Sequence, residues 1–409
     1  MFKRARTISQ QRAVGPSIRI LLLVVCALFV VAVDAPALTA AAGGAPSSGA
    51  AGAGLSPSGC PAATPAEAAA ATPGAPTRVR AIAGNGSVTV RWCPPLQGQG
   101  SIVSYTVLSS SGQQVTVRVP NDWAIIDGLT NGTAYSFTVR AVTGSGAVSQ
   151  PSARTRQVTP APLPPPRDVI VGRPKKVTFD QYSLLIGGKR TVIYAGEFDP
   201  WRLPSPSLWL DRLQKMKADG FNAVTPYFDW AYHSPSPGVY DFSGVRDVNL
   251  FLNDAHKAGL YVIARPGPYI NAETDAGGFP GWLVTQQGMA RSDAPDYVAA
   301  ALQWYSEIDP IIAAHQITRG GDVILYQVEN ELEYNDASTS HYMAELEAKA
   351  RADGINVPLT GNHNGVFQGG TGAVDIPGYD QYPLGFDCSN TSTFATPHGY
   401  THQPGVPLL

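Results

Sequence analysis

The chain has 409 residues, enough for two or three domains and a large hydrophobic core. Its 29 basic and 31 acidic residues give a formal net charge of -2. The basic residues do not cluster beyond the N-terminus, which argues against nucleic acid as a partner, because a phosphate polymer requires a basic face.

The N-terminus has the pattern of an export signal. Basic residues from Lys3 to Arg19 precede an unbroken apolar run over 20–33, and small residues follow over 35–42. The apolar run has about 14 residues, fewer than the ~20 that span a bilayer. We therefore expect a cleaved signal peptide over 1–38, a secreted protein, and no contact with a membrane beyond the signal. A retained N-terminal anchor is the alternative.

Residues 39–75 are mostly Ala, Gly, Pro and Ser, with few large apolar side chains. Such a segment buries too little apolar surface to offset the entropy lost on ordering. The composition predicts a disordered linker.

Three cysteines, Cys60, Cys93 and Cys388, follow the predicted signal. None forms a CxxC pair or has a histidine at ligand spacing, so the sequence predicts no metal site. An odd number in an exported chain leaves two alternatives, a free thiol or a partner outside this sequence, and does not define the pairing.

Residues 76–160 alternate between apolar and polar side chains in three short segments, at 87–92, 104–108 and 134–141, with turn signals between them. This pattern predicts a small β-sandwich. The position of Trp92 and the run 129–135, which ends in a tyrosine, resemble a fibronectin type III domain. The resemblance allows a spacer or a module that binds cell-wall polysaccharide. The lack of clustered aromatic residues favours the spacer.

A Pro-rich linker is predicted over 161–172, and from 173 to 409 apolar strands alternate with amphipathic helices. This alternation predicts a parallel sheet covered by helices, and here a (β/α)₈ TIM barrel truncated after about six strands. An open doubly wound sheet is the alternative, but no Gly-rich phosphate loop follows the first strand. Strands are predicted at 191–195, 223–228, 260–264, 323–328, 357–360 and 373–376, and helices at 207–218, 245–258, 295–315 and 338–353.

Polar residues gather where these strands end, which is where TIM barrels carry their chemistry. Glu197 follows the first strand, Tyr227 lies at the end of the second and Asp229 just after it, Arg265 follows the third, and Glu331 the fourth. Carboxylates accept hydrogen bonds from hydroxyl groups, and aromatic rings pack on the apolar face of a pyranose. The combination indicates a sugar-binding site.

Five motifs of this region resemble the family 35 glycoside hydrolases, which are β-galactosidases, and the resemblance covers about 177 to the end. The order of the motifs along the chain makes the match specific. The resemblance implies hydrolysis of terminal β-galactosides with retention of configuration, without a metal or an organic cofactor. The motifs lie at 194–198, 202–204, 265–273, 277–283 and 327–331.

The resemblance also implies roles for individual residues. Glu331 matches the general acid/base, and Glu197 is interpreted as a fixed sugar-binding or structural carboxylate. Asp199 stands where the family often has histidine, and His233 is a weaker candidate for a sugar contact. The residues matched to substrate binding are Tyr227, Asn271, Ala272, Glu273, Asn330 and Tyr382.

Two points remain open in the sequence. Glu329 competes with Glu331 for the acid/base role, but Glu331 lies nearer the barrel mouth, so we expect Glu329 to be a structural partner of Arg265 or another buried donor. The family nucleophile is a glutamate on a seventh strand, and no glutamate follows Glu347. We therefore expect the nucleophile to be missing from this chain and the 409-residue chain to be inactive as a hydrolase. The alternatives are another retaining β-glycosidase, or an inactive sugar-binding fragment.

Overall fold

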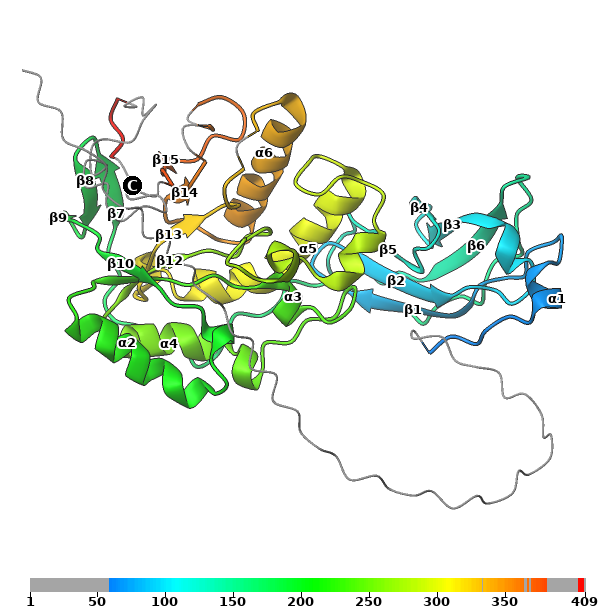
Figure 1. The fold of residues 1–409 in the computed structure, drawn as a ribbon, viewed down its shortest axis with the longest axis horizontal. Helices are drawn as coiled ribbons and strands as arrows, with labels where there is room; N and C mark the ends of the chain where they lie inside the picture. Colours follow the sequence, from blue (N-terminus) through cyan, green and yellow to red (C-terminus); the bar gives the residue numbers. More distant parts are fainter. Residues whose placement is uncertain (1–58, 333, 364–365, 368, 381–403, 408–409) are drawn as a thin grey trace, which may run out of the picture. The chain divides into compact units, whose positions relative to one another are not determined.

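The computed structural model describes residues 59–332, 334–363, 366–367, 369–380 and 404–407. It contains an antiparallel β-sandwich followed by a parallel α/β sheet (Figure 1). The predicted signal peptide, Tyr382 and Cys388 lie outside the described residues.

The sandwich consists of two antiparallel sheets of three strands each. Alternate residues of the strands point inward, and the buried set includes Trp92, Tyr105 and Phe137. The hydroxyl of Tyr135 accepts a hydrogen bond from the Thr130 N–H (3.0 Å), as expected for a corner tyrosine. The strand orders are β1 (Thr77–Ala83), β2 (Val88–Cys93), β5 (Trp123–Ile126), and β4 (Gln114–Arg118), β3 (Ile102–Ser109), β6 (Phe137–Thr143).

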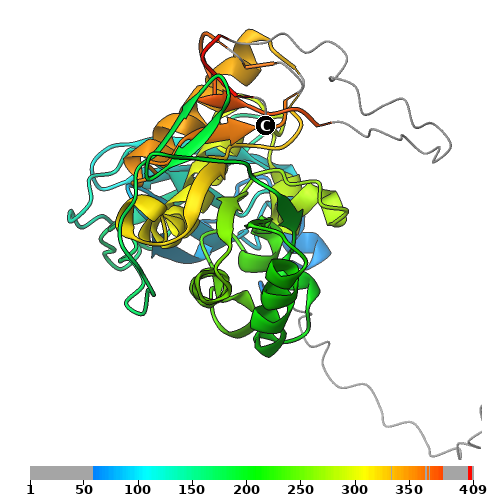
Figure 2. The same cartoon turned by 90° about the vertical axis from the view of Figure 1, so that its left-hand side faces the viewer.

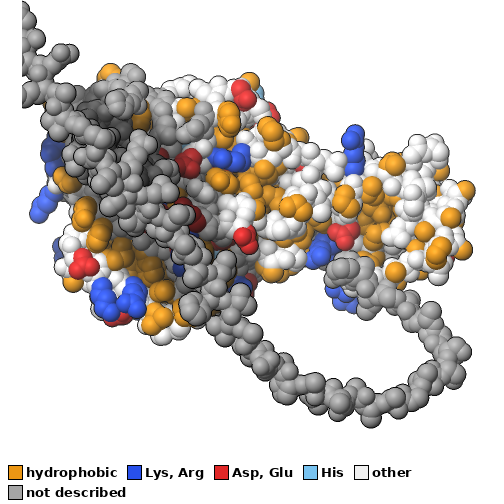
Figure 3. Space-filling view, in the orientation of Figure 1, with side chains coloured by type: hydrophobic (Ala, Val, Ile, Leu, Met, Phe, Trp, Pro, Cys, Tyr) orange, Lys and Arg blue, Asp and Glu red, His pale blue; other side chains and the backbone are white. Residues whose placement is uncertain are grey.

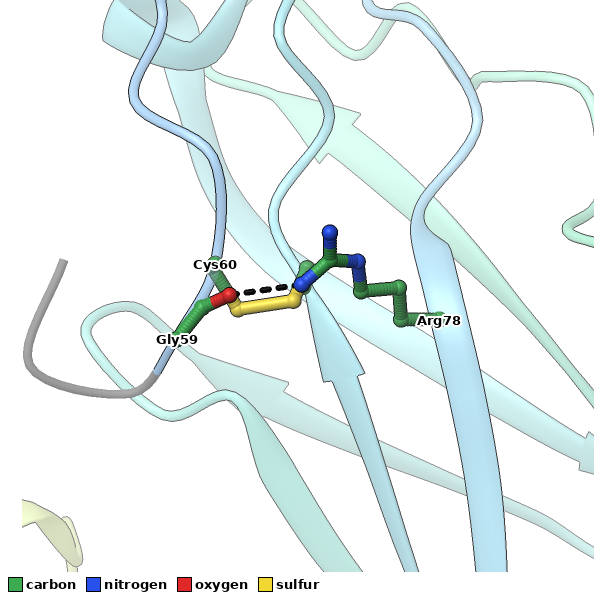
Figure 4. The surroundings of a disulfide bond; sticks show 4 residues. Gly59, Cys60 and Arg78 are labelled. Carbon is green, nitrogen blue, oxygen red and sulfur yellow. Dashed lines mark hydrogen bonds between the residues drawn. A yellow bond between two sulfur atoms is a disulfide. The ribbon is translucent and has the colours of Figure 1, made fainter. Parts of the chain in front are cut away.

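A disulfide ties the segment before β1 to the end of β2. Cys60 is bonded to Cys93, and Arg78 donates a hydrogen bond to the carbonyl of Gly59 (2.6 Å; Figure 4). A short helix, α1 (Pro65–Ala68), lies in the same segment. The structure thus differs from the predicted disordered linker in its last part, because a cross-link reduces the entropy that would otherwise oppose order there.

The second part is a parallel sheet whose six strands pair in chain order, which is a partial TIM barrel. Parallel neighbours need crossover connections, and helices provide four of them. α2 and α4 pack side by side, as do α5 and α6 (Figures 1 and 2). The strands are β10 (Ala195–Glu197), β11 (Ala223–Thr225), β12 (Tyr261–Ala264), β13 (Val323–Gln327), β14 (Leu359–Gly361) and β15 (Ile376–Pro377).

The helices begin and end at residues suited to these positions. The side chain of Asp247 accepts from the Leu250 N–H at the start of α4, and Gly259 ends that helix with a left-handed φ of 70°. The α-helices are α2 (Trp209–Ala218), α3 (Trp230–His233), α4 (Val248–Ala258), α5 (Pro295–Ala314) and α6 (Ala337–Ala352). Short 3₁₀ helices span Gln99–Ser101, Pro200–Arg202, Pro206–Leu208, Gly244–Arg246, Asp275–Gly278, Gly281–Thr285 and Ile317–Arg319.

The first barrel strand lies later than predicted. Residues 191–195 were expected to form it, but β9 (Lys189–Thr191) belongs to a separate antiparallel sheet with β7 (Val177–Asp180) and β8 (Ser183–Ile186). The Asn222 side chain accepts from the Tyr194 N–H (2.8 Å) and donates to the Val192 carbonyl (2.7 Å). These backbone groups therefore bond to a side chain, and the barrel strand starts only at Ala195.

The described residues of the sandwich and of the parallel sheet belong to one compact unit, in which the sandwich contacts α5. The buried amide of Gln303 donates to the Thr89 hydroxyl (3.0 Å). Trp123 lies edge-on to Trp282, with ring centroids 5.1 Å apart. The spacer interpretation does not require such contacts, and they were not predicted from the sequence.

The molecular surface carries charged, polar and apolar side chains interspersed with one another. On the face drawn in Figure 3, Lys and Arg side chains lie scattered among polar and apolar ones. Among the residues with a described position, no helix is long and apolar enough to cross a membrane.

Candidate active site

A cavity of about 600 Å³ lies at the parallel sheet, and its lining includes side chains that follow the carboxyl ends of five neighbouring strands. The strands place these side chains together because parallel strands end at the same edge of the sheet. Tyr382 lies outside the described residues. Seven other residues predicted for the site line the cavity: Glu197, Tyr227, Asn271, Ala272, Glu273, Asn330 and Glu331.

Asn330 is the centre of a buried hydrogen-bond network. Its side-chain oxygen accepts from the Tyr227 hydroxyl (2.7 Å), from the Asn362 amide (2.8 Å) and from the Arg265 guanidinium (3.2 Å). With the oxygen saturated by donors, the amide nitrogen of Asn330 is left as the donor toward the Glu331 carboxylate (3.5 Å). The network therefore fixes which end of the amide faces Glu331.

Arg265 places a positive charge beside this network. Its guanidinium lies 3.7 Å from the centroid of the Tyr227 ring and 3.5 Å from the carboxylate of Glu197, whose side chain is 46% exposed. Burial, followed by the charge of Asp199, raises the pKa of Glu197, while Arg265 lowers it. The arrangement favours the interpretation of Glu197 as a fixed carboxylate rather than an attacking one.

The cavity wall contains backbone in the left-handed region. Asn271, Ala272 and Glu273 have φ angles of 53°, 46° and 43°, and together we call them the 271–273 turn. Glu331 has a φ of 47°. This region costs roughly 1–2 kcal/mol per non-glycine residue, and such strain is concentrated at functional sites.

Side chains that follow β14 hold the backbone at Glu331. The Glu331 N–H donates to the side-chain oxygen of Asn362 (3.0 Å), and the Leu332 N–H donates to Nδ1 of His363 (3.2 Å). Burial lowers the pKa of His363 to about 4, which keeps its ring neutral and able to accept this bond. The acid/base candidate is thus oriented by the next strand of the sheet.

Glu329 is a buried structural carboxylate with three donors. It accepts from the Arg291 guanidinium (2.8 Å), the Tyr342 hydroxyl (2.8 Å) and the N–H of Asn330 (2.9 Å), and it is 1% exposed. Glu329 was expected to pair with Arg265 or with another buried donor. The second alternative is the one found, since Arg291 is the partner and Arg265 bonds Glu197 and Asn330.

Sequence reasoning missed four residues that support the site: Asn362, His363, Arg291 and Tyr342. Asn362 and His363 follow a predicted strand, so the strand-end rule could have found them, whereas no local pattern marks the other two. His233 is 3% exposed and its Nδ1 lies 3.0 Å from the Asp241 carbonyl oxygen, so the structure gives it a structural partner.

Within the part of the chain that the structure describes, no group of three or more His, Cys, Asp or Glu side chains is arranged to hold a metal ion.

Similar proteins match both parts of the chain. The fibronectin type III model matches residues 74–158, and β-galactosidase A of a Penicillium species is 46% identical over 231 residues, covering 54% of this chain and 23% of its own length. The β-galactosidase of Aspergillus niger is 46% identical over 232 residues, with coverage of 54% and 23%. The chain therefore spans about a quarter of the length of these curated relatives.

Solved structures are less similar. An exo-β-1,4-mannosidase from an Opitutaceae bacterium matches with a TM-score of 0.41 and 16% identity, over 50% of this chain and 40% of its own, which is too weak to support an argument. The model for glycosyl hydrolases family 35 matches residues 183–404, more than half of the chain. The chain belongs to glycosyl hydrolase family 35.

Proposed function

We propose that the protein is a retaining glycoside hydrolase that releases terminal β-galactose from oligo- or polysaccharides, with Glu331 as general acid/base. The observation that carries the proposal is the convergence of Glu331, Asn330 and the 271–273 turn on one cavity. The similar proteins named β-galactosidase support the choice of sugar.

The geometry suits the role of a proton donor. A retaining glycosidase needs one carboxyl group to protonate the leaving oxygen and a second, ~5–5.5 Å away, to attack the anomeric carbon. Glu331 is partly buried at the cavity, and the Asn330 amide is directed toward it. We assign the attacking role to no residue of this sequence.

Galactose binding tests the proposal directly. We expect titration calorimetry of the chain to show binding of galactose that is tighter than binding of glucose or mannose, and Asn330→Ala to weaken it. Tighter binding of mannose or glucose would favour another β-glycosidase. No heat of binding with any of the three sugars would refute a sugar-binding cavity.

A sugar-binding chain without hydrolysis is the second candidate. Nitrophenyl β-galactoside separates the two candidates: turnover that Glu331→Gln abolishes supports hydrolysis, and galactose binding without turnover supports the second.

We also propose that the chain is exported. The N-terminal pattern over 1–38 supports this, as does the Cys60–Cys93 disulfide, since disulfides persist in oxidising compartments. Expression with the native N-terminus should yield a product that lacks the leader by mass spectrometry. A product that keeps Met1 and stays in the cell would contradict the proposal.

A further inference from the structure

Arg202 connects two parts of the cavity wall from behind. Its Nε donates to the Asp199 carboxylate (3.2 Å), and its Nη2 donates to the carbonyl oxygen of Ala272. The 3₁₀ helix Pro200–Arg202 turns the chain back so that Arg202 meets Asp199 three residues earlier. One guanidinium therefore links the end of β10 to the 271–273 turn.

Asp199 is fixed independently of Arg202. It is 3% exposed, and its second oxygen accepts from the N–H of Tyr227 (3.0 Å). Burial raises the pKa of Asp199, while the Tyr227 N–H and Arg202 lower it. The carboxylate is thus a buried anchor that orients the guanidinium and also fixes the backbone of a cavity residue.

The 271–273 turn needs this support because its three residues are all left-handed. The carbonyl of Asn271 accepts from the Thr274 N–H (3.1 Å), which leaves the Ala272 carbonyl to Arg202. A peptide unit is planar, so a bond to the Ala272 carbonyl also fixes the orientation of the Glu273 N–H. The Ala272 side chain packs in a small cluster with Tyr227.

Neither Arg202 nor Asp199 belongs to the cavity lining, as far as the described residues define it, whereas Ala272 and Tyr227 do. An effect of Arg202 on a sugar must therefore pass through the turn. The guanidinium also lies 4.4 Å from the centroid of the Trp201 ring, which limits its movement.

We propose that Arg202, oriented by Asp199, is a positioning residue that holds the 271–273 turn in the shape required for sugar binding. The inference rests on the proposed sugar-binding function. Lys keeps the charge but lacks the planar fork, so it cannot donate to Asp199 and Ala272 in the same geometry.

The test compares Arg202→Ala and Arg202→Lys with Arg212→Ala as a matched control. Arg212 lies on α2, is 49% exposed against 44% for Arg202, and also pairs with an aspartate. We expect galactose to bind about 10-fold more weakly to Arg202→Ala, which corresponds to ~1.4 kcal/mol. Arg202→Lys should lie between Arg202→Ala and the parent, Arg212→Ala should match the parent, and added guanidinium ion should restore part of the affinity of Arg202→Ala.

Hydrogen exchange provides a readout that needs no sugar. In Arg202→Ala the amides of Ile270 and Thr274, which bond within the loop of the turn, should exchange faster, while those of β13 keep their rates. Unchanged exchange at Ile270 and Thr274 would overturn the inference. Equal galactose affinity in Arg202→Ala and the parent would overturn it as well. If the parent binds no sugar, the proposed function fails, and the exchange rates alone decide whether Arg202 holds the turn.

Discussion

The pair Glu329 and Glu331 allows a direct test of which carboxylate supports the fold and which serves the chemistry. Glu329→Gln replaces a buried acceptor of three donors by an amide with one oxygen. The amide oxygen can keep Arg291 and the N–H of Asn330, which share one carboxylate oxygen, and the NH₂ then faces the Tyr342 hydroxyl, which can accept. What the substitution removes is the negative charge opposite Arg291. Hydrogen bonds to charged groups contribute about 1.5–3 kcal/mol each. The Arg291 side chain is 22% exposed, so hydrogen bonds to water replace part of its interaction with the lost carboxylate charge.

We therefore expect Glu329→Gln to lower the free energy of unfolding by roughly 3 kcal/mol, close to the cost of breaking a buried ion pair. Glu331 is partly buried, and glutamine keeps its shape, so Glu331→Gln should change stability by less than about 0.5 kcal/mol. Urea unfolding at neutral pH, followed by circular dichroism, measures both. Equal effects of the two substitutions, or a larger effect of Glu331→Gln, would refute the assignment of Glu329 as the structural carboxylate.

Three further predictions concern other contacts. Asn362→Ala removes the acceptor of the Glu331 N–H and should weaken galactose binding about 10-fold by calorimetry; unchanged affinity would contradict the orienting role. The pKa of His363 is about 4 in the fold and 6.5 in the unfolded chain, so the unfolded chain binds the proton first and stability falls as the pH drops from about 6.5 to 4. His363→Gln should remove up to roughly 3 kcal/mol of that fall in urea titrations at several pH values, and an identical pH profile would refute it. Gln303→Leu leaves the Thr89 hydroxyl without its partner and should cost about 1–3 kcal/mol of stability, which an unchanged unfolding midpoint would exclude.

Much of the parallel sheet could be predicted because periodicity and strand-end chemistry are local. Predicted strands overlap β11, β12, β13, β14 and β15, and the polar residues after them meet at one cavity. The first strand overlaps β10 only at Ala195, because Asn222, from a later segment of the chain, bonds the backbone of residues 192–194. A side chain from outside the segment decided its structure.

The supporting residues of the site were harder to predict than the lining residues. Glu329 and Arg291 meet only after folding, and no spacing in the sequence relates them. The left-handed conformation of Ala272 was also unforeseen, because alanine carries no preference for that region. Both are effects of tertiary packing.

Because Cys60 and Cys93 form a disulfide, the state in which the sandwich is produced depends on the redox conditions of the compartment where it folds. In a cytosol kept reducing by glutathione both sulfurs remain thiols, and the segment before β1 lacks its covalent tie to β2. When the chain folds in an oxidising compartment, formation of this disulfide removes two hydrogen atoms, so the protein is lighter than its reduced form by that mass. Intact-mass spectrometry would therefore distinguish correctly finished batches from unfinished ones before any assay with sugar.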